Sequence, residues 1–227
     1  MIETFPTAND AAGGAADAIV GQLAPPGPKR IVVTGGRSPG PVYDRLANAD
    51  LNWSRVTVTL SDDRFVDPTS PDSNERLVRE RLLKGCAASA HFVPLKGRGP
   101  APRVDAARAE SAIRALLPFD AVLLGVGEDG HIASLFPGAR GLAEALDPTR
   151  GPLVIGVAKA GLAPYVPRIS LTATALFDAG LVVVLTSGDA KRALLERVAS
   201  DPGFAPPVAA LLRQTRTPVR VLWSPGP

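Results

Sequence analysis

The sequence alternates between short apolar runs rich in β-branched residues and longer segments with helical periodicity. Runs that are apolar at every position are typical of strands covered on both faces, as in parallel sheets. Six such runs are predicted to be strands of one parallel sheet: residues 30–34, 56–60, 119–127, 153–158, 181–185 and 219–223.

The segments between these runs carry the start and stop signals of helices. Three helices are predicted in residues 71–85, 104–118 and 189–200. The first has Asp72, Ser73 or Asn74 available as its N-cap, and the third begins with Asp189 as a cap. A further helix is predicted to start near Pro39, since proline is favoured in a first helical turn.

This alternation of strands and helices predicts a doubly wound α/β fold, with a mostly parallel sheet and helices on both faces. The 227 residues, 45% of them hydrophobic, suffice for a substantial core, and no repeat or linker divides them. We therefore expect a single α/β domain over residues 1–227. Ligands of such folds bind at the carboxyl ends of the strands, so the loops after the strands should carry the functional residues.

Composition and charge argue against several classes of function. The net charge is only +3, with basic and acidic residues interleaved, and aromatic residues make up 5%, so we expect no nucleic-acid partner. No signal peptide and no apolar run of membrane-spanning length is present, so we expect a cytoplasmic protein without a membrane partner. A single cysteine, Cys86, and two histidines argue against a disulfide and a metal cluster.

A glycine-rich loop follows the first predicted strand. Gly35 and Gly36 let the backbone approach an anion closely. Arg37 adds positive charge, Ser38 can donate from its hydroxyl, and the next helix points its positive end at the same place. The loop lacks the lysine of a Walker A motif. It is therefore either a phosphate-binding loop of another kind or a plain structural turn.

Three charged residues, Asp62, Asp63 and Arg64, follow the second predicted strand. Because side chains alternate along a strand, Asp62 and Arg64 should share one side. A surface ion-pair cluster is the alternative interpretation, but the position at the carboxyl edge of the sheet favours a functional role.

Residues 125–131, GVGEDGH, match the G-x-G-x-x-G pattern of dinucleotide-binding proteins. That pattern requires a helix of several turns after the third glycine and an acidic residue at the end of the next strand. Pro137 leaves room for only one or two helical turns, and the next predicted strand leads into Lys159. The segment therefore does not predict a nicotinamide-dinucleotide site.

The same segment favours a catalytic histidine. Its glycines allow a tight turn that exposes the imidazole of His131 above the sheet edge, with Asp129 beside it. Imidazole has an ordinary pKa of ~6.5, which suits a general base, and a carboxylate can fix its tautomer. We predict His131 as the base, against the alternative of a hydrogen-bonded structural histidine. His91 is interpreted as structural.

Two more basic residues complete the candidate site. Arg168 lies near a short predicted strand, and Lys191 lies in the first turn of the third predicted helix. A lysine is unfavourable at the positive end of a helix, which suggests a bound anion there.

Together, residues 34–47, 61–74, 119–138, 167–172 and 186–195 resemble the 6-phosphogluconolactonase family in order and spacing. Residues 125–138, GVGEDGHIASLFPG, are the most specific part. The glucosamine-6-phosphate isomerase/deaminases share this fold, but they carry an acidic residue where this chain has Phe136, and they read D-E-Y where it has DDR. Both differences favour the lactonases, although Asp63 stands where lactonases more often have glutamate.

The resemblance implies hydrolysis of 6-phospho-D-glucono-1,5-lactone to 6-phosphogluconate in the pentose phosphate pathway, with no metal and no cofactor. The partner would be the small phosphorylated lactone. His131 would activate a water, and Asp129 or Asp62 would orient the imidazole of His131. Arg64 would stabilise the oxyanion. The phosphate would be anchored by Gly35, Gly36, Arg37, Ser38, Arg168 and Lys191.

Three alternatives remain open. Ser134, expected on the short helix after His131, could be a nucleophile, but no G-x-S-x-G elbow surrounds it. An isomerase or deaminase of an amino-sugar phosphate is the enzymatic alternative. A non-catalytic sugar-phosphate sensor is the other, although the roughly thirty residues before the first strand are short for a DNA-binding segment.

Overall fold

A computed structural model describes residues 2–158 and 165–226 of the chain, so Lys159 lies outside the described residues. Its centre is a seven-stranded sheet in which every neighbouring pair of strands is parallel. In spatial order the strands are β1 (Ile2–Thr4), β10 (Val219–Ser224), β9 (Ala179–Ser187), β6 (Phe119–Leu124), β2 (Lys29–Val33), β3 (Val56–Leu60) and β5 (His91–Val93).

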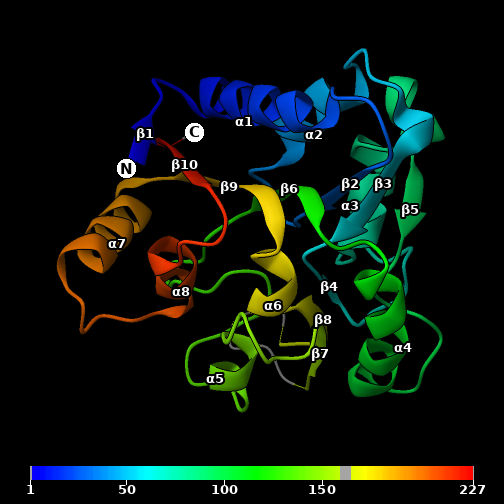
Figure 1. The fold of residues 1–227 in the computed structure, drawn as a ribbon. Helices are drawn as coiled ribbons and strands as arrows, with labels where there is room; N and C mark the ends of the chain where they lie inside the picture. Colours follow the sequence, from blue (N-terminus) through cyan, green and yellow to red (C-terminus); the bar gives the residue numbers. More distant parts are fainter. Residues whose placement is uncertain (1, 159–164, 227) are drawn as a thin grey trace.

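Helices cover both faces of this sheet. Figure 1 shows α1 (Ala8–Leu23) and α2 (Gly40–Ala47) on one side, and α6 (Ala173–Leu176) and α8 (Pro207–Arg213) on the other. The remaining helices are α3 (Asn74–Arg81), α4 (Pro102–Arg114), α5 (Leu142–Ala145) and α7 (Asp189–Ser200), with short 3₁₀ turns at Trp53–Arg55 and Gly85–Ser89. The predicted doubly wound α/β fold is confirmed.

The strand order creates a crevice at the middle of the sheet. From β2 the chain adds β3 and β5 on one side, whereas β6, β9, β10 and β1 build the other side. The connections after β2 and β6 therefore run to opposite sides of the sheet. This leaves a gap between the carboxyl ends of the two strands, where ligands of doubly wound folds bind.

A second, three-stranded antiparallel sheet lies beside this crevice, in the order β4 (Asp62–Arg64), β8 (Arg168–Leu171) and β7 (Val154–Val157). The placement of residues 153–158 in the parallel sheet is therefore wrong. Only Val154 of β7 is buried, and Gly156 packs so closely on α4 that a Cβ atom would lie 2.4 Å from the backbone N of Arg103. The strand is thus covered by α4 on one face and pairs with β8, and not with a strand of the large sheet.

Two predictions of local structure are also corrected. The short helix expected directly after His131 does not form, because Ala133 takes a positive φ of 48° and residues 132 and 135 form an isolated antiparallel bridge. The N-cap of α7 is Gly188 and not Asp189, which is the first helical residue. For α3 the cap is Ser73, whose hydroxyl accepts from the N–H of Arg76 at 3.2 Å. The edge strands β1 and β5 were not predicted; both are short and only partly buried.

Candidate active site

A pocket of about 320 Å³ opens at the carboxyl ends of β2, β3, β6 and β9, where the strand order reverses. Its volume is within the range of small-ligand sites. It brings together nine of the ten predicted site residues: Gly35, Gly36, Arg37, Ser38, Asp62, Arg64, His131, Arg168 and Lys191. The tenth, Asp129, lies behind His131 and contacts it.

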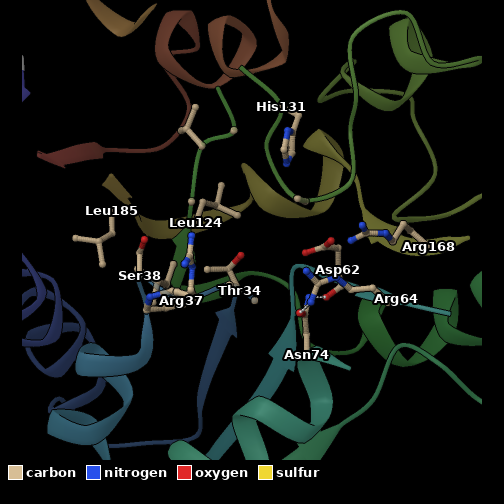
Figure 2. A pocket seen from close by; sticks show the side chains of 18 of the residues that line it. Thr34, Arg37, Ser38, Asp62, Arg64, Asn74, Leu124, His131, Arg168 and Leu185 are labelled. Carbon is tan, nitrogen blue, oxygen red and sulfur yellow. Dashed lines mark hydrogen bonds between the residues drawn. The ribbon is translucent and has the colours of Figure 1, made fainter. Parts of the chain in front are cut away.

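The loop after β6 presents the imidazole of His131 to this pocket (Figure 2). Nδ1 of His131 lies 2.6 Å from Oδ1 of Asp129, and the backbone N–H of His131 donates to the same oxygen at 3.1 Å. Because a carboxylate only accepts hydrogen bonds, Nδ1 carries the proton in the neutral ring and Nε2 keeps a lone pair. The arrangement leaves Nε2 available to accept a proton.

Gly127 makes this pair possible. A Cβ atom on Gly127 would lie 2.0 Å from Nδ1 of His131 and 2.6 Å from Oδ1 of Asp129. The loop closes through hydrogen bonds from the N–H of Gly127 to the carbonyl of His131 and from the N–H of Gly130 to the carbonyl of Gly127. The glycines of GVGEDGH therefore provide space and turn geometry for a histidine and a carboxylate.

Asp62 is held by two serine hydroxyls. Its Oδ2 accepts from Ser134 Oγ at 2.5 Å and its Oδ1 from Ser61 Oγ at 3.0 Å. Ser134 is buried, and its N–H donates to Ser170 Oγ. Ser134 is therefore buried and engaged in holding Asp62, and it does not stand on a G-x-S-x-G elbow, which argues against its use as a nucleophile. Of the two acids considered as partners of His131, Asp129 makes the contact.

The alternation expected for residues 62–64 is present. Asp62 and Arg64 line the pocket, whereas the buried carboxylate of Asp63 points to the N-terminus of α3. There it accepts from the N–H groups of Asn74 at 2.6 Å and Glu75 at 3.2 Å. Burial raises the pKa of Asp63 to about 6, against the opposing effect of these hydrogen bonds.

Arg64 and Arg168 face each other across paired strands. They are register partners in the antiparallel pair of β4 and β8, and both line the pocket. Burial, followed by the charge of Arg64, lowers the pKa of Arg168. Figure 2 places both arginines beside Asp62, on the side of the pocket away from Arg37 and Ser38. Two adjacent guanidinium groups form a locally positive wall that suits an anionic or electron-rich ligand.

The opposite side of the pocket is formed by the loop after β2 and the start of α7. Gly36 has a positive φ of 96°, which favours glycine, and Arg37 and Ser38 follow it at the pocket wall. Lys191, in the first turn of α7, lines the same pocket. Here the glycine-rich loop, the two cations and the N-terminal end of α2 converge, as expected of a phosphate site.

Sequence reasoning missed one site residue. Asn74 was considered only as a possible helix cap, but it lines the pocket and bonds both Arg64 and the backbone of Asp62. Its signals in the sequence are its place next to Ser73 and its inclusion in residues 61–74, one of the stretches that resemble the lactonases.

Other residues lie apart from the site. His91 and Cys86 are exposed, on β5 and in a 3₁₀ turn. Within residues 2–158 and 165–226, no three His, Cys, Asp or Glu side chains are grouped as metal ligands. In the same part of the chain, no helix has the length and apolar character needed to cross a membrane.

Comparison with known proteins is consistent with this geometry. The family model for glucosamine-6-phosphate isomerases/6-phosphogluconolactonase matches residues 6–223. A 6-phosphogluconolactonase of Caulobacter vibrioides is 46% identical over 227 residues, covering 98% of this chain and 97% of the relative. The crystal structure of a 6-phosphogluconolactonase from Shewanella baltica has a TM-score of 0.88 at 34% identity, covering 99% of this chain and 97% of that chain.

A monomeric glucosamine-6-phosphate deaminase shares the fold, with a TM-score of 0.83 at 16% identity, covering 98% of this chain and 96% of that chain. The chain therefore belongs to the glucosamine-6-phosphate isomerase/6-phosphogluconolactonase family. Within that family, the relatives from Caulobacter vibrioides and Shewanella baltica are both 6-phosphogluconolactonases. This confirms the predicted resemblance to that enzyme.

Proposed function

We propose that this protein hydrolyses 6-phospho-D-glucono-1,5-lactone to 6-phosphogluconate, in the oxidative branch of the pentose phosphate pathway and in the cytoplasm. The observation that carries the proposal is the pair of His131 and Asp129, 2.6 Å apart, at a pocket walled by cations on two sides. The 46% identity to a 6-phosphogluconolactonase over nearly the whole chain supports the same reaction.

In this proposal His131 is the general base. A water beside the lactone carbonyl loses a proton to Nε2 as its oxygen attacks C1, and the ionised Asp129 stabilises the resulting imidazolium through Nδ1–H. Collapse of the tetrahedral intermediate breaks the bond from C1 to the ring oxygen. That oxygen takes the proton back from His131, which yields a free hydroxyl and a carboxylic acid.

Arg64 and Arg168 serve the lactone end of the substrate. Negative charge develops on the carbonyl oxygen during attack, and a guanidinium already in place stabilises it without reorganisation. Arg64 is the proposed oxyanion donor, with Arg168 adding positive charge beside it. This replaces the expectation that Arg168 belongs with the phosphate anchors.

The phosphate is proposed to lie at the other end of the pocket. The backbone of Gly35 and Gly36, the Ser38 hydroxyl and the cations of Arg37 and Lys191 would hold it there. Anchoring the phosphate fixes where the lactone ring lies relative to His131, so binding energy is used to align the reacting atoms. The proposed partner is accordingly a small phosphorylated lactone and not a nucleic acid.

The deaminase alternative has a structural argument against it. Phe136 occupies the position of the acidic residue expected in a deaminase, and its ring lies 4.7 Å from that of His131, tilted by 44°. Phe136 is buried and its side chain has no ionisable group, so this neighbour of the histidine supplies no charge.

A paired assay tests the proposed function. The purified protein is given the phosphorylated lactone, with correction for spontaneous opening, and glucosamine 6-phosphate. We expect accelerated lactone opening and no ammonia release. Ammonia release without lactone opening would establish the deaminase, and binding of either compound without turnover would establish a sensor.

A further inference from the structure

Asn74 is a buried amide that connects two parts of the site. It is 2% exposed and is the first residue of α3. Its Oδ1 accepts from Nη1 of Arg64 at 2.6 Å, and its Nδ2 donates to the carbonyl oxygen of Asp62 at 2.8 Å. Figure 2 shows the amide directly beneath the guanidinium.

These two contacts permit only one orientation of the amide. Rotation by 180° would set Nδ2 against the donor Nη1 of Arg64 and Oδ1 against the acceptor oxygen of Asp62. A side chain with one donor and one acceptor is therefore required, and it holds the guanidinium of Arg64 at a fixed distance from the backbone of β4.

The position of Asn74 is itself fixed from two sides. The Asp63 carboxylate accepts from its backbone N–H at 2.6 Å, which ties the start of α3 to β4. The phosphate-loop residue Gly35 packs on the amide so closely that a Cβ atom there would lie 1.9 Å from Oδ1. Asn74 thus lies between the proposed phosphate loop and the proposed oxyanion donor.

Both acceptors that hold the Arg64 side chain are neutral. They are Asn74 Oδ1 and the carbonyl of Asp72, at 3.0 Å. Among the residues that the structure describes, Arg64 forms no ion pair with a carboxylate, whereas Arg81 and Arg220 pair with Asp44 and Glu3. A carboxylate in place of the amide would offset the charge on Arg64.

We propose that Asn74 is a positioning residue that orients Arg64 toward the lactone end of the pocket through a neutral contact, in place of a direct ion pair with a carboxylate. The inference rests on the proposed lactonase function, because it assigns Arg64 to the reacting carbonyl. It adds a requirement on the chemistry of this contact: the side chain that holds Arg64 must be an amide.

A double-mutant cycle tests this inference. We expect Asn74→Ala to lower kcat/KM by about tenfold or more in the native background and by less than about twofold in an Arg64→Ala background, because residues that act through one group are not additive. Asn48→Ala is the matched control, since it removes an exposed amide that donates to the Asp44 carbonyl at 2.7 Å, away from the pocket. It should leave activity unchanged.

Asn74→Asp gives a second test that keeps size and packing. The carboxylate retains a bond to Arg64 but offsets its charge and loses the donor to the Asp62 carbonyl, so kcat should fall while binding of 6-phosphogluconate through its phosphate persists. Additive losses in the cycle, or native kcat in Asn74→Asp, would overturn the inference in an active wild-type enzyme. Absence of lactone hydrolysis by the wild type would instead refute the proposed function.

Discussion

Nδ1 of His131 lies 2.6 Å from Oδ1 of Asp129, only two residues earlier in the same loop. The proposed base and its orienting carboxylate therefore come from one tight turn, which is closed by hydrogen bonds of its own backbone and is also held by the bond from the N–H of Val208 to the carbonyl of Gly130. The remaining parts of the site come from other strands and are aligned with this pair by the sheet.

Removing the charge of Asp129 should slow the reaction without weakening substrate binding. Asp129→Asn keeps the size of the side chain and an oxygen for Nδ1–H, but it loses the charge that stabilises the imidazolium. We expect kcat to fall by at least about tenfold, which corresponds to about 1.4 kcal/mol, with KM little changed. Steady-state kinetics measure both constants, and an unchanged kcat would exclude an electrostatic role for Asp129.

Gly127→Ala should displace the proposed catalytic pair, His131 and Asp129, by steric contact. The added methyl would lie 2.0 Å from Nδ1 of His131, so the ring must move. Displacement of about an ångström from a reactive geometry costs about a hundredfold in rate, while affinity for 6-phosphogluconate should persist.

The control for this variant is Gly21→Ala, at an exposed position of α1 where a Cβ atom meets nothing within 4 Å. Replacing a helical glycine with alanine should raise the free energy of unfolding by about 0.5–1 kcal/mol and leave kcat unchanged. Native kinetics in Gly127→Ala would show that the loop tolerates the methyl and that the steric argument is wrong.

Removing either cation of the proposed phosphate end should mainly weaken binding. Arg37→Ala and Lys191→Ala each delete a charge-assisted contact worth about 1.5–3 kcal/mol, so KM should rise by about ten- to a hundredfold with a smaller change in kcat. Arg197→Ala on α7, where the side chain is 61% exposed, serves as control and should keep native KM. A loss confined to kcat would indicate that the phosphate binds at the other end of the pocket.

The stability of the protein should depend on pH through Asp63. Burial raises the pKa of Asp63 to about 6, above its ordinary value of ~3.9 in an unfolded chain. The folded state therefore binds the proton more tightly, so this contribution to stability is complete below about pH 4 and is lost as the pH rises through about 6. Urea unfolding across this range should show that the free energy of unfolding of the wild type falls relative to that of Asp63→Asn as the pH rises. A constant difference between the two proteins would contradict the assignment.

The parts of the site that could be predicted from the sequence are those set by local rules. The turn that presents His131 follows from its glycines, and the shared side of Asp62 and Arg64 follows from strand alternation. The small antiparallel sheet could not be predicted, because residues 154–157 are as apolar as a buried strand and only their packing on α4 separates them from the large sheet.

Contacts between distant segments were also beyond sequence reasoning. The hydroxyl of Ser134 reaches Asp62 across 72 positions of sequence, and this bond becomes visible only once β4 and the loop after β6 lie side by side. The interpretation of Asn74 as a cap missed its side-chain contacts for a related reason, since the partners of a buried amide depend on tertiary structure.

The most direct test of the central claim is the rate of 6-phosphogluconolactone hydrolysis by wild type and His131→Ala, each corrected for spontaneous opening of the lactone. General-base catalysis contributes about a hundred- to ten-thousandfold, so the variant should lose that factor in kcat while it still binds 6-phosphogluconate and keeps the wild-type melting temperature. Turnover near the wild-type level in a folded His131→Ala protein would contradict the account.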